Sequence, residues 1–281
     1  IFADGKEYVI RKGAIDNEYS RKVFELVKEN EELIRNAKPQ VSKNSAGYYL
    51  WNVWDGQTFD LNKLLVGSQG TLGIMTEVTV SLVPMKKHHD LITIFFNSWE
   101  ELPRVVNAIM PYDPESLETF DKDTLKLGIR FMPEIARKAG KSLFSFATQF
   151  LPEAWMGVGM GGLPELVILV EVAEESEEEG KRKVEKILDG IKNFNVKSRV
   201  IEKDGEEKKF WIMRRESFNL LREHVQGKRT VPLVDDFCIP VEKVPEFLPR
   251  AKQILENAGI EVNIAGHAGN GNFHIIPLMD L

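Results

Sequence analysis

Short apolar runs rich in β-branched residues alternate with helical patterns after residue 90 of the chain. The apolar runs predict strands at 91–96, 116–120, 165–173, 196–202 and 234–239. Apolar residues at helical spacing between them predict helices at 98–110, 176–193, 206–225 and 246–258. Strands and helices of this spacing are typical of an α+β domain in which helices cover one sheet.

The first 85 residues carry a different pattern. An opening strand–turn–strand, with Asp4-Gly5 at the turn, is followed by a helical pattern over 19–37. A glycine-rich loop at 67–74 then leads into an alternating β-branched segment, 75–83, which predicts a strand. Pro84 and the basic residues after it indicate a boundary, so we expect two domains, 1–85 and 86–281.

The composition excludes several classes of protein. The 281 residues are 43% hydrophobic, which suffices for a substantial core, and 37 Lys and Arg against 43 Asp and Glu leave a net charge of -6. Without a long basic run, a nucleic-acid partner is not expected. The single Cys238 excludes a disulfide framework and fits a cytoplasmic location. Because no apolar run approaches the roughly 20 residues that span a bilayer, we expect no transmembrane segment; peripheral association with the inner face of a membrane stays open.

The loop at 67–74 is the first candidate binding site. Its glycines and small side chains let the backbone approach a ligand, and amides exposed in such a turn suit phosphate or ring carbonyl oxygens. An ordinary tight turn is the alternative interpretation. The candidate residues are Gly67, Ser68, Gln69, Gly70, Thr71, Gly73 and Ile74. A second glycine-rich string, 157–162, matches G-x-G-x-x-G, but Pro164 and a strand follow it instead of a helix, which favours a simple loop.

Two histidines and one arginine are the candidates for chemistry. His267 and His274 flank a Gly/Asn-rich loop between apolar segments, so they can face one another across a hairpin and bind one divalent metal. Core histidines bonded to the loop backbone are the alternative. Arg214 shares a helix face with Trp211, so its guanidinium points to the packed side and needs an anion. That anion is either an aspartate at 235 or 236, or a substrate carboxylate.

Three strings carry a resemblance to a known family. Residues 65–77 resemble the G-S-E-G-T-L-G-I-I-T-E segment of FAD-linked oxidases of the vanillyl-alcohol oxidase type, which include D-lactate dehydrogenases, glycolate oxidase and D-2-hydroxyglutarate dehydrogenase. Residues 266–274 resemble the family's G-H-x-G-D-G-N-x-H motif, and 211–214 its W-x-x-R element. The resemblance implies an α+β architecture: the second part of a PCMH-type FAD-binding domain at 1–85, then a cap domain at 86–281 with an antiparallel sheet covered by helices.

The resemblance also implies a reaction and its residues. The loop at 67–74 would bind FAD, Arg214 the substrate carboxylate, and His267 and His274 a divalent metal (Zn, Fe or Mn), with Asn272 also in the site. A D-2-hydroxy acid would be oxidised to the 2-oxo acid with hydride transfer to the flavin. Three positions where the D-2-hydroxyglutarate branch has Lys, Thr and Asn hold Val234, Phe218 and Ile276, so a monocarboxylic substrate, D-lactate or glycolate, is favoured.

Some expectations stay open at this stage. The electron acceptor is a quinone, an electron-transfer protein or an iron–sulfur domain, and a non-catalytic partner subunit of a larger redox complex is the alternative function. The family places its pyrophosphate loop upstream of Ile1, and its third metal ligand and histidine base downstream of Leu281. We therefore expect the chain to be cut from a longer flavoprotein, and the 281 residues alone to bind FAD weakly and to be inactive.

Overall fold

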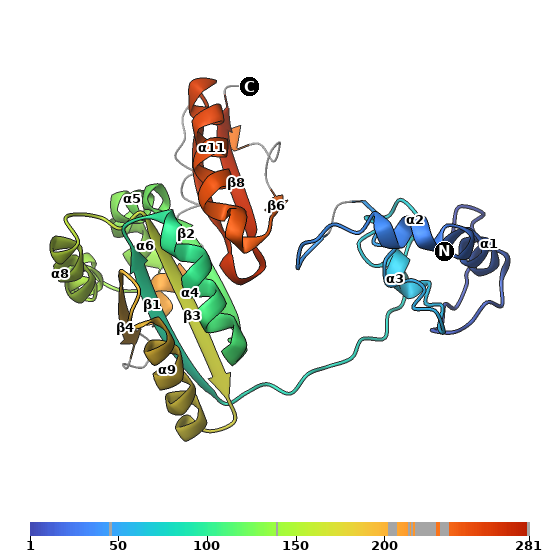
Figure 1. Ribbon diagram of the computed structural model, residues 1–281, viewed down its shortest axis with the longest axis horizontal. Helices are drawn as coiled ribbons and strands as arrows, with labels where there is room; N and C mark the ends of the chain where they lie inside the picture. Colours follow the sequence, from blue (N-terminus) through green and yellow to red (C-terminus); the bar gives the residue numbers. More distant parts are fainter. Residues whose placement is uncertain are drawn as a thin grey trace. The chain divides into compact units, whose positions relative to one another are not determined.

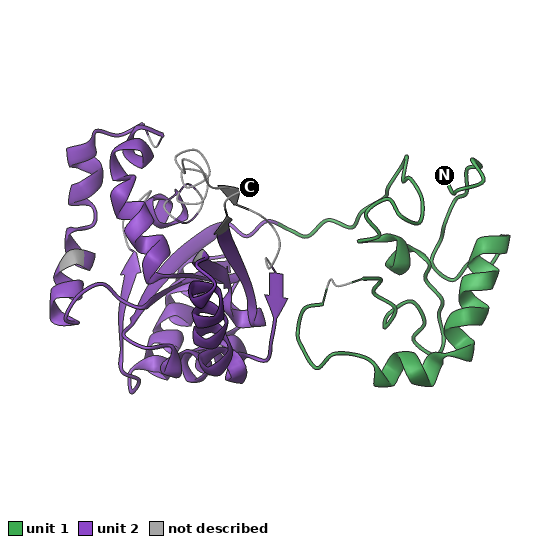
Figure 2. Ribbon diagram, turned by 90° about the horizontal axis from the view of Figure 1, so that it is seen from above, with its two compact units in different colours: residues 1–84 green, residues 85–281 purple. Residues whose placement is uncertain are grey.

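The computed structural model describes residues 1–44, 47–138, 140–201, 207–212, 214, 216, 229–230 and 236–279. In it, the β-branched runs after residue 90 that predict strands pair into one sheet. The chain divides into two compact units, Ile1–Pro84 and Met85–Leu281 (Figure 2). The strands of the second unit are β1 His88–Phe96, β2 Ser116–Asp121, β3 Leu166–Glu174, β4 Val196–Ile201, β5 Arg229–Thr230, β6 Asp236–Cys238, β7 Glu261–His267 and β8 Asn272–Met279.

Every strand pairing described is antiparallel. The strand order is β4-β1-β3-β2-β7-β8-β5, and β6 also pairs with β8. The register aligns Glu118 of β2 with His267 of β7, and both Ala265 and Asp236 with His274 of β8. Residues far apart in the sequence therefore meet at the β2–β7–β8–β6 end of the sheet.

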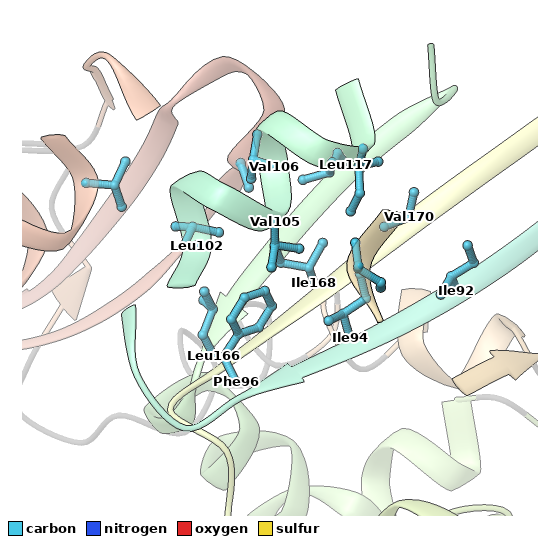
Figure 3. Packing of buried hydrophobic residues seen from close by; sticks show 14 of the residues in the cluster. Ile92, Ile94, Phe96, Leu102, Val105, Val106, Leu117, Leu166, Ile168 and Val170 are labelled. Atoms are coloured by element: carbon cyan, nitrogen blue, oxygen red, sulfur yellow. The ribbon is translucent and has the colours of Figure 1, made fainter. Parts of the chain in front are cut away.

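One face of the sheet is covered by α4 Leu102–Ile109, α9 Glu177–Ile191 and α11 Val244–Asn257 (Figure 1). Alternate residues of each strand point to this side because side chains along a strand have a period of two. Figure 3 shows the resulting layer, in which β1 and β3 side chains meet those of α4. Its fully buried members include Ile92, Ile94, Phe96, Leu102, Val105, Leu166, Ile168 and Ile187.

The opposite face is covered by a second group of helices. These are α5 Lys122–Arg130, α6 Met132–Lys138, α7 Leu143–Thr148, α8 Leu151–Gly159 and the helical residues 207–212. Residues of α5, α8 and 207–212 pack on a smaller apolar cluster that includes Phe95, Phe120, Val167 and Ala265, whereas α6 and α7 pack together in a separate cluster. Since Glu118 and Phe120 are two residues apart on β2, Glu118 points to the same face.

The first unit is held by a small core of its own. Its helices are α1 Glu18–Glu29, α2 Glu31–Asn36 and α3 Asn62–Leu65. Val27, Val53, Phe59, Leu61 and Leu64 are buried together in it. The second unit also contains short 3-10 helices: η1 Trp99–Glu101, η2 Met110–Tyr112, η3 Val241–Lys243 and η4 Ala268–Asn270.

The predicted fold class, an antiparallel sheet covered by helices, is confirmed. The strands expected at 75–83 and in the opening hairpin do not form. Neither segment has a ladder partner in the described structure, and alternation alone cannot make a strand without a neighbour to receive its hydrogen bonds. Gly157–Gly159 closes α8, so the second glycine-rich string is no dinucleotide loop.

Several predicted features lie outside the described residues. They are most of the helix predicted at 206–225, which includes Phe218, and the residues Val234 and Asp235. In the described part of the chain, no helix has the length and apolar character needed to cross a membrane.

Candidate active site

The β7–β8 hairpin brings the two candidate histidines together. His267 ends β7, His274 lies on β8, and the turn between them passes through η4. Gly271 adopts a left-handed conformation with φ +62, and a Cβ there would lie 1.9 Å from the carbonyl oxygen of Ile239. A Cβ on Gly266 would lie 2.2 Å from the carbonyl oxygen of Asn272. The two glycines therefore permit a close backbone approach that no other residue allows.

The two imidazole rings have a separation that fits a shared metal ion. Their centroids are 5.6 Å apart and their planes are 84° to one another. Two imidazoles that bind one metal at about 2.0–2.1 Å with a tetrahedral angle have centroids roughly 5 Å apart. No set of three or more His, Cys, Asp or Glu side chains arranged to hold a metal occurs within the described residues. Among the described residues, the histidine pair alone therefore does not make a complete metal site.

Each histidine has a carboxylate beside its Nδ1 atom. Glu118 Oε1 lies 2.7 Å from Nδ1 of His267, and Asp236 Oδ1 lies 3.7 Å from Nδ1 of His274. The amide of the buried Asn272 donates to Asp236 and, at 2.9 Å, to the carbonyl of Phe237, which fixes this edge of β6 against β8. A carboxylate at Nδ1 favours the tautomer in which Nδ1 carries the proton and Nε2 carries the lone pair. This is the usual arrangement of metal-bound histidines.

Arg214 lies on the helical segment that faces the same end of the sheet. Its Nη2 atom donates to Glu118 Oε2 at 2.5 Å, while its Nε is buried with no hydrogen-bond partner in the part of the chain that the structure describes. The expectation that a buried guanidinium needs an anion is met by Glu118. Asp236, one of the two aspartates considered from the sequence, bonds with Asn272 instead.

Glu118 was missed by the sequence reasoning. Its two partners, His267 and Arg214, are 149 and 96 positions away in the sequence. Local periodicity carries no information about contacts over such separations. One signal was present: a carboxylate interrupts the apolar and hydroxyl residues of the predicted strand 116–120. A charge in the middle of a buried strand needs a partner, which marks such a position for attention.

The glycine-rich loop of the first unit is a compact turn. Gly67, Gln69 and Gly70 all have positive φ, and the carbonyl of Ser68 accepts from the amide and the hydroxyl of Thr71 at 3.0 and 2.6 Å. Gly73 passes close to the carbonyl of Ile1, 2.9 Å from where its Cβ would be. The tight-turn interpretation is therefore satisfied, and the exposed residues Gly67, Gln69, Gly70 and Thr71 leave the loop open to a ligand.

Comparison with known families gives the class of domain that this fold and its histidine hairpin represent, a domain of flavin-linked oxidoreductases. Residues 85–281 match the family described as FAD linked oxidases, C-terminal domain. The chain belongs to this family, and the resemblance drawn from its motifs is confirmed.

Characterised relatives lie in several branches. D-2-hydroxyglutarate dehydrogenase of Pseudomonas putida is 25% identical over 270 residues, which are 94% of this chain and 25% of that protein. D-lactate dehydrogenase of Archaeoglobus fulgidus is 27% identical over 88% of this chain and 46% of its own length. Glycolate oxidase subunit GlcD of Bacillus subtilis is 25% identical, over 89% and 45%. The chain spans from a quarter to less than half of the length of these relatives.

Solved structures show the same architecture. The 4-ethylphenol oxidase from Gulosibacter chungangensis, in an isoeugenol complex, superposes with a TM-score of 0.51 at 14% identity, covering 84% of this chain and 47% of that one. An alkyldihydroxyacetonephosphate synthase gives 0.53 at 14% identity, covering 79% and 43%. At this identity the likeness concerns the fold alone.

Proposed function

We propose that the protein is a FAD-dependent oxidoreductase that oxidises a D-2-hydroxy acid, with D-lactate or glycolate favoured, to the 2-oxo acid. The observation that carries the proposal is the buried Nε of Arg214, which has no acceptor among the described residues. The same guanidinium donates to Glu118, the carboxylate that also contacts His267. A buried donor without a partner costs about 1–3 kcal/mol, so its retention favours a ligand that supplies the acceptor. A substrate carboxylate has the right charge and geometry for a guanidinium.

The other residues of the hairpin would serve the hydroxyl end of the substrate. His267 and His274 would hold a divalent metal (Zn, Fe or Mn), and the ring separation of 5.6 Å supports this. A bound metal supplies a Lewis acid that lowers the pKa of the substrate hydroxyl. Asn272 acts indirectly in this proposal, because it holds Asp236 beside His274.

The flavin site is proposed in residues 1–85, as the second part of the FAD-binding domain. The backbone of the loop at 67–74 would contact FAD, which would supply the hydride acceptor when bound. The α-hydrogen of the substrate would then leave with its electron pair, and a base would take the hydroxyl proton. The open turn with three positive-φ residues supports this assignment. The acceptor that reoxidises the flavin, a quinone, an electron-transfer protein or an iron–sulfur domain, stays open.

A small monocarboxylic substrate fits the hairpin better than a dicarboxylic one. Ile276 lies two residues after His274 on β8, so it points to the same face of the sheet. An apolar side chain at this point offers nothing to bind a second carboxylate. We place the enzyme in the cytoplasm, consistent with its one free thiol, Cys238.

Substitution of the arginine tests the proposal in the product of the full open reading frame. Arg214→Ala should raise KM for D-lactate about 10- to 100-fold, since a hydrogen bond to a charged group contributes about 1.5–3 kcal/mol. Arg104→Ala is the matched control, because Arg104 is a largely exposed arginine of α4 that pairs with Glu101 and lies over the ring of Phe194, away from the histidine hairpin. If Arg214→Ala has the KM of Arg104→Ala, Arg214 is not the clamp. If no 2-hydroxy acid reduces the flavin of the wild type, the chain is better explained as a non-catalytic subunit.

A further inference from the structure

Glu118 is a carboxylate whose two oxygens are each used for a different functional candidate. Oε1 lies 2.7 Å from Nδ1 of His267, and Oε2 lies 2.5 Å from Nη2 of Arg214. The Glu118 side chain is only 12% exposed. Removal of a carboxylate from water to this extent is costly, and the arginine offsets that cost.

The position of Glu118 is set by the sheet. Its Cα is the register partner of His267 in the antiparallel β2–β7 ladder. Its neighbour Leu117 points to the opposite face, where it joins the main core. A side chain fixed on a central strand has little freedom, so Glu118 can hold both of its partners in one geometry.

The contacts differ in kind from an ordinary surface ion pair. A second glutamate–histidine pair on the same sheet, Glu171 of β3 with His89 of β1, has a similar length of 3.1 Å. The His89 side chain is 48% exposed, and the other oxygen of Glu171 accepts from Ser116 rather than from an arginine. This pair offers an internal control for what a glutamate–histidine contact contributes to stability alone.

We propose that Glu118 is a positioning residue that couples the substrate clamp to the metal site. It keeps the Nδ1–H of His267 turned toward itself, so that Nε2 is the atom available to a metal. It also holds Arg214 through Nη2, so that the Nε–H, which has no partner among the described residues, is directed to the substrate carboxylate. The inference rests on the proposed function and adds a link between its two halves.

Two substitutions separate this role from a structural one. Glu118→Ala removes both acceptors, and it should weaken the binding of Zn²⁺ to the metal-depleted protein by about 10- to 100-fold, the usual loss for a partner of a metal-bound histidine. KM for D-lactate should rise in the same variant. Glu118→Gln keeps the shape but offers one acceptor oxygen instead of two, so it should spare one of the two properties and impair the other.

The experiment uses the full open reading frame, with wild type, Glu118→Ala, Glu118→Gln and the control Glu171→Ala. Zn²⁺ affinity is measured by competition with a chelator, and KM and kcat are measured separately with D-lactate. The inference predicts that Glu171→Ala keeps wild-type values while Glu118→Ala loses both. Should Glu118→Ala not fold, Glu118→Gln decides alone.

The outcomes distinguish a failure of the positioning role of Glu118 from a failure of the proposed function. If the wild type binds Zn²⁺ and oxidises D-lactate while both Glu118 variants match Glu171→Ala, the positioning role is wrong and the proposed function stands. If the wild type neither binds Zn²⁺ nor oxidises any 2-hydroxy acid, the proposed function fails and the inference falls with it.

Discussion

Replacement of Gly271 by alanine tests how the histidine hairpin is held. At φ +62 a residue with a Cβ pays about 1–2 kcal/mol for the left-handed conformation. The added Cβ would also lie 1.9 Å from the carbonyl oxygen of Ile239, and this backbone atom cannot rotate away. The connection after β6 would have to move, which strains the 2.9 Å hydrogen bond from the amide of Ile239 to the carbonyl of Gly271. With about 1 kcal/mol for that bond, the loss reaches roughly 2–3 kcal/mol before other backbone strain is counted.

Gly259→Ala is the matched control for this substitution. Gly259 also has a positive φ, +76, but nothing lies within 4 Å of where its Cβ would be. It should therefore lose only the conformational part, about 1–2 kcal/mol. Urea unfolding, followed by circular dichroism, should place the midpoint of Gly271→Ala roughly 0.3–1 M below that of Gly259→Ala, given slopes of about 1–3 kcal/mol/M. Equal midpoints would refute the claim that close backbone approach, and not conformation alone, requires glycine at the turn.

Two further predictions concern stability. Burial raises the pKa of Asp121 from 3.8 to about 6, against the opposing hydrogen bonds from Thr124. The folded state therefore keeps a proton that the unfolded state releases, so stability falls as the pH rises from about 4 to 6, by up to about 3 kcal/mol. Asp121→Asn retains an oxygen to cap α5 but cannot titrate, and its unfolding free energy should stay flatter over this window; parallel curves would contradict this. Ile187 is a fully buried residue of α9, so Ile187→Ala should lower the free energy of unfolding, measured with denaturant, by about 2–5 kcal/mol. Ile254→Ala, at a 60% exposed position of α11, should cost less than about 0.5 kcal/mol, and similar losses would refute the assigned layers.

The sheet was predictable because its strands are locally encoded. The apolar runs of β1 and β3 are long enough to be recognised without a partner, and both are found within three residues of the predicted bounds. The two-histidine hairpin was predictable for a similar reason, since only six residues separate His267 from His274 and two of them are glycines, which leaves few ways to turn. The segment 75–83 also has a β-branched pattern and is not a strand, which shows that alternation predicts only a tendency to form a strand.

The connections within the site were not predictable from local patterns. The register of β2 against β7 brings Glu118 to His267, and that register depends on the whole strand order. The sequence left two anions open for Arg214, an aspartate at 235 or 236 and a substrate carboxylate; Asp236 accepts from Asn272 instead, and Asp235 lies outside the described residues. Competition between polar partners is decided by tertiary packing, and a sequence read segment by segment cannot resolve it.

The central claim is that the chain forms part of an enzyme that transfers hydride from a D-2-hydroxy acid to flavin. Its most direct test is the anaerobic reduction of the flavin in the full open reading frame product, followed by its visible absorbance, with D-lactate, L-lactate and glycolate, each with and without a metal chelator. The account predicts bleaching of the flavin by D-lactate or glycolate, little by L-lactate, and slower bleaching with the chelator. A flavin that stays oxidised with all three acids, or a rate that the chelator leaves unchanged, would contradict it.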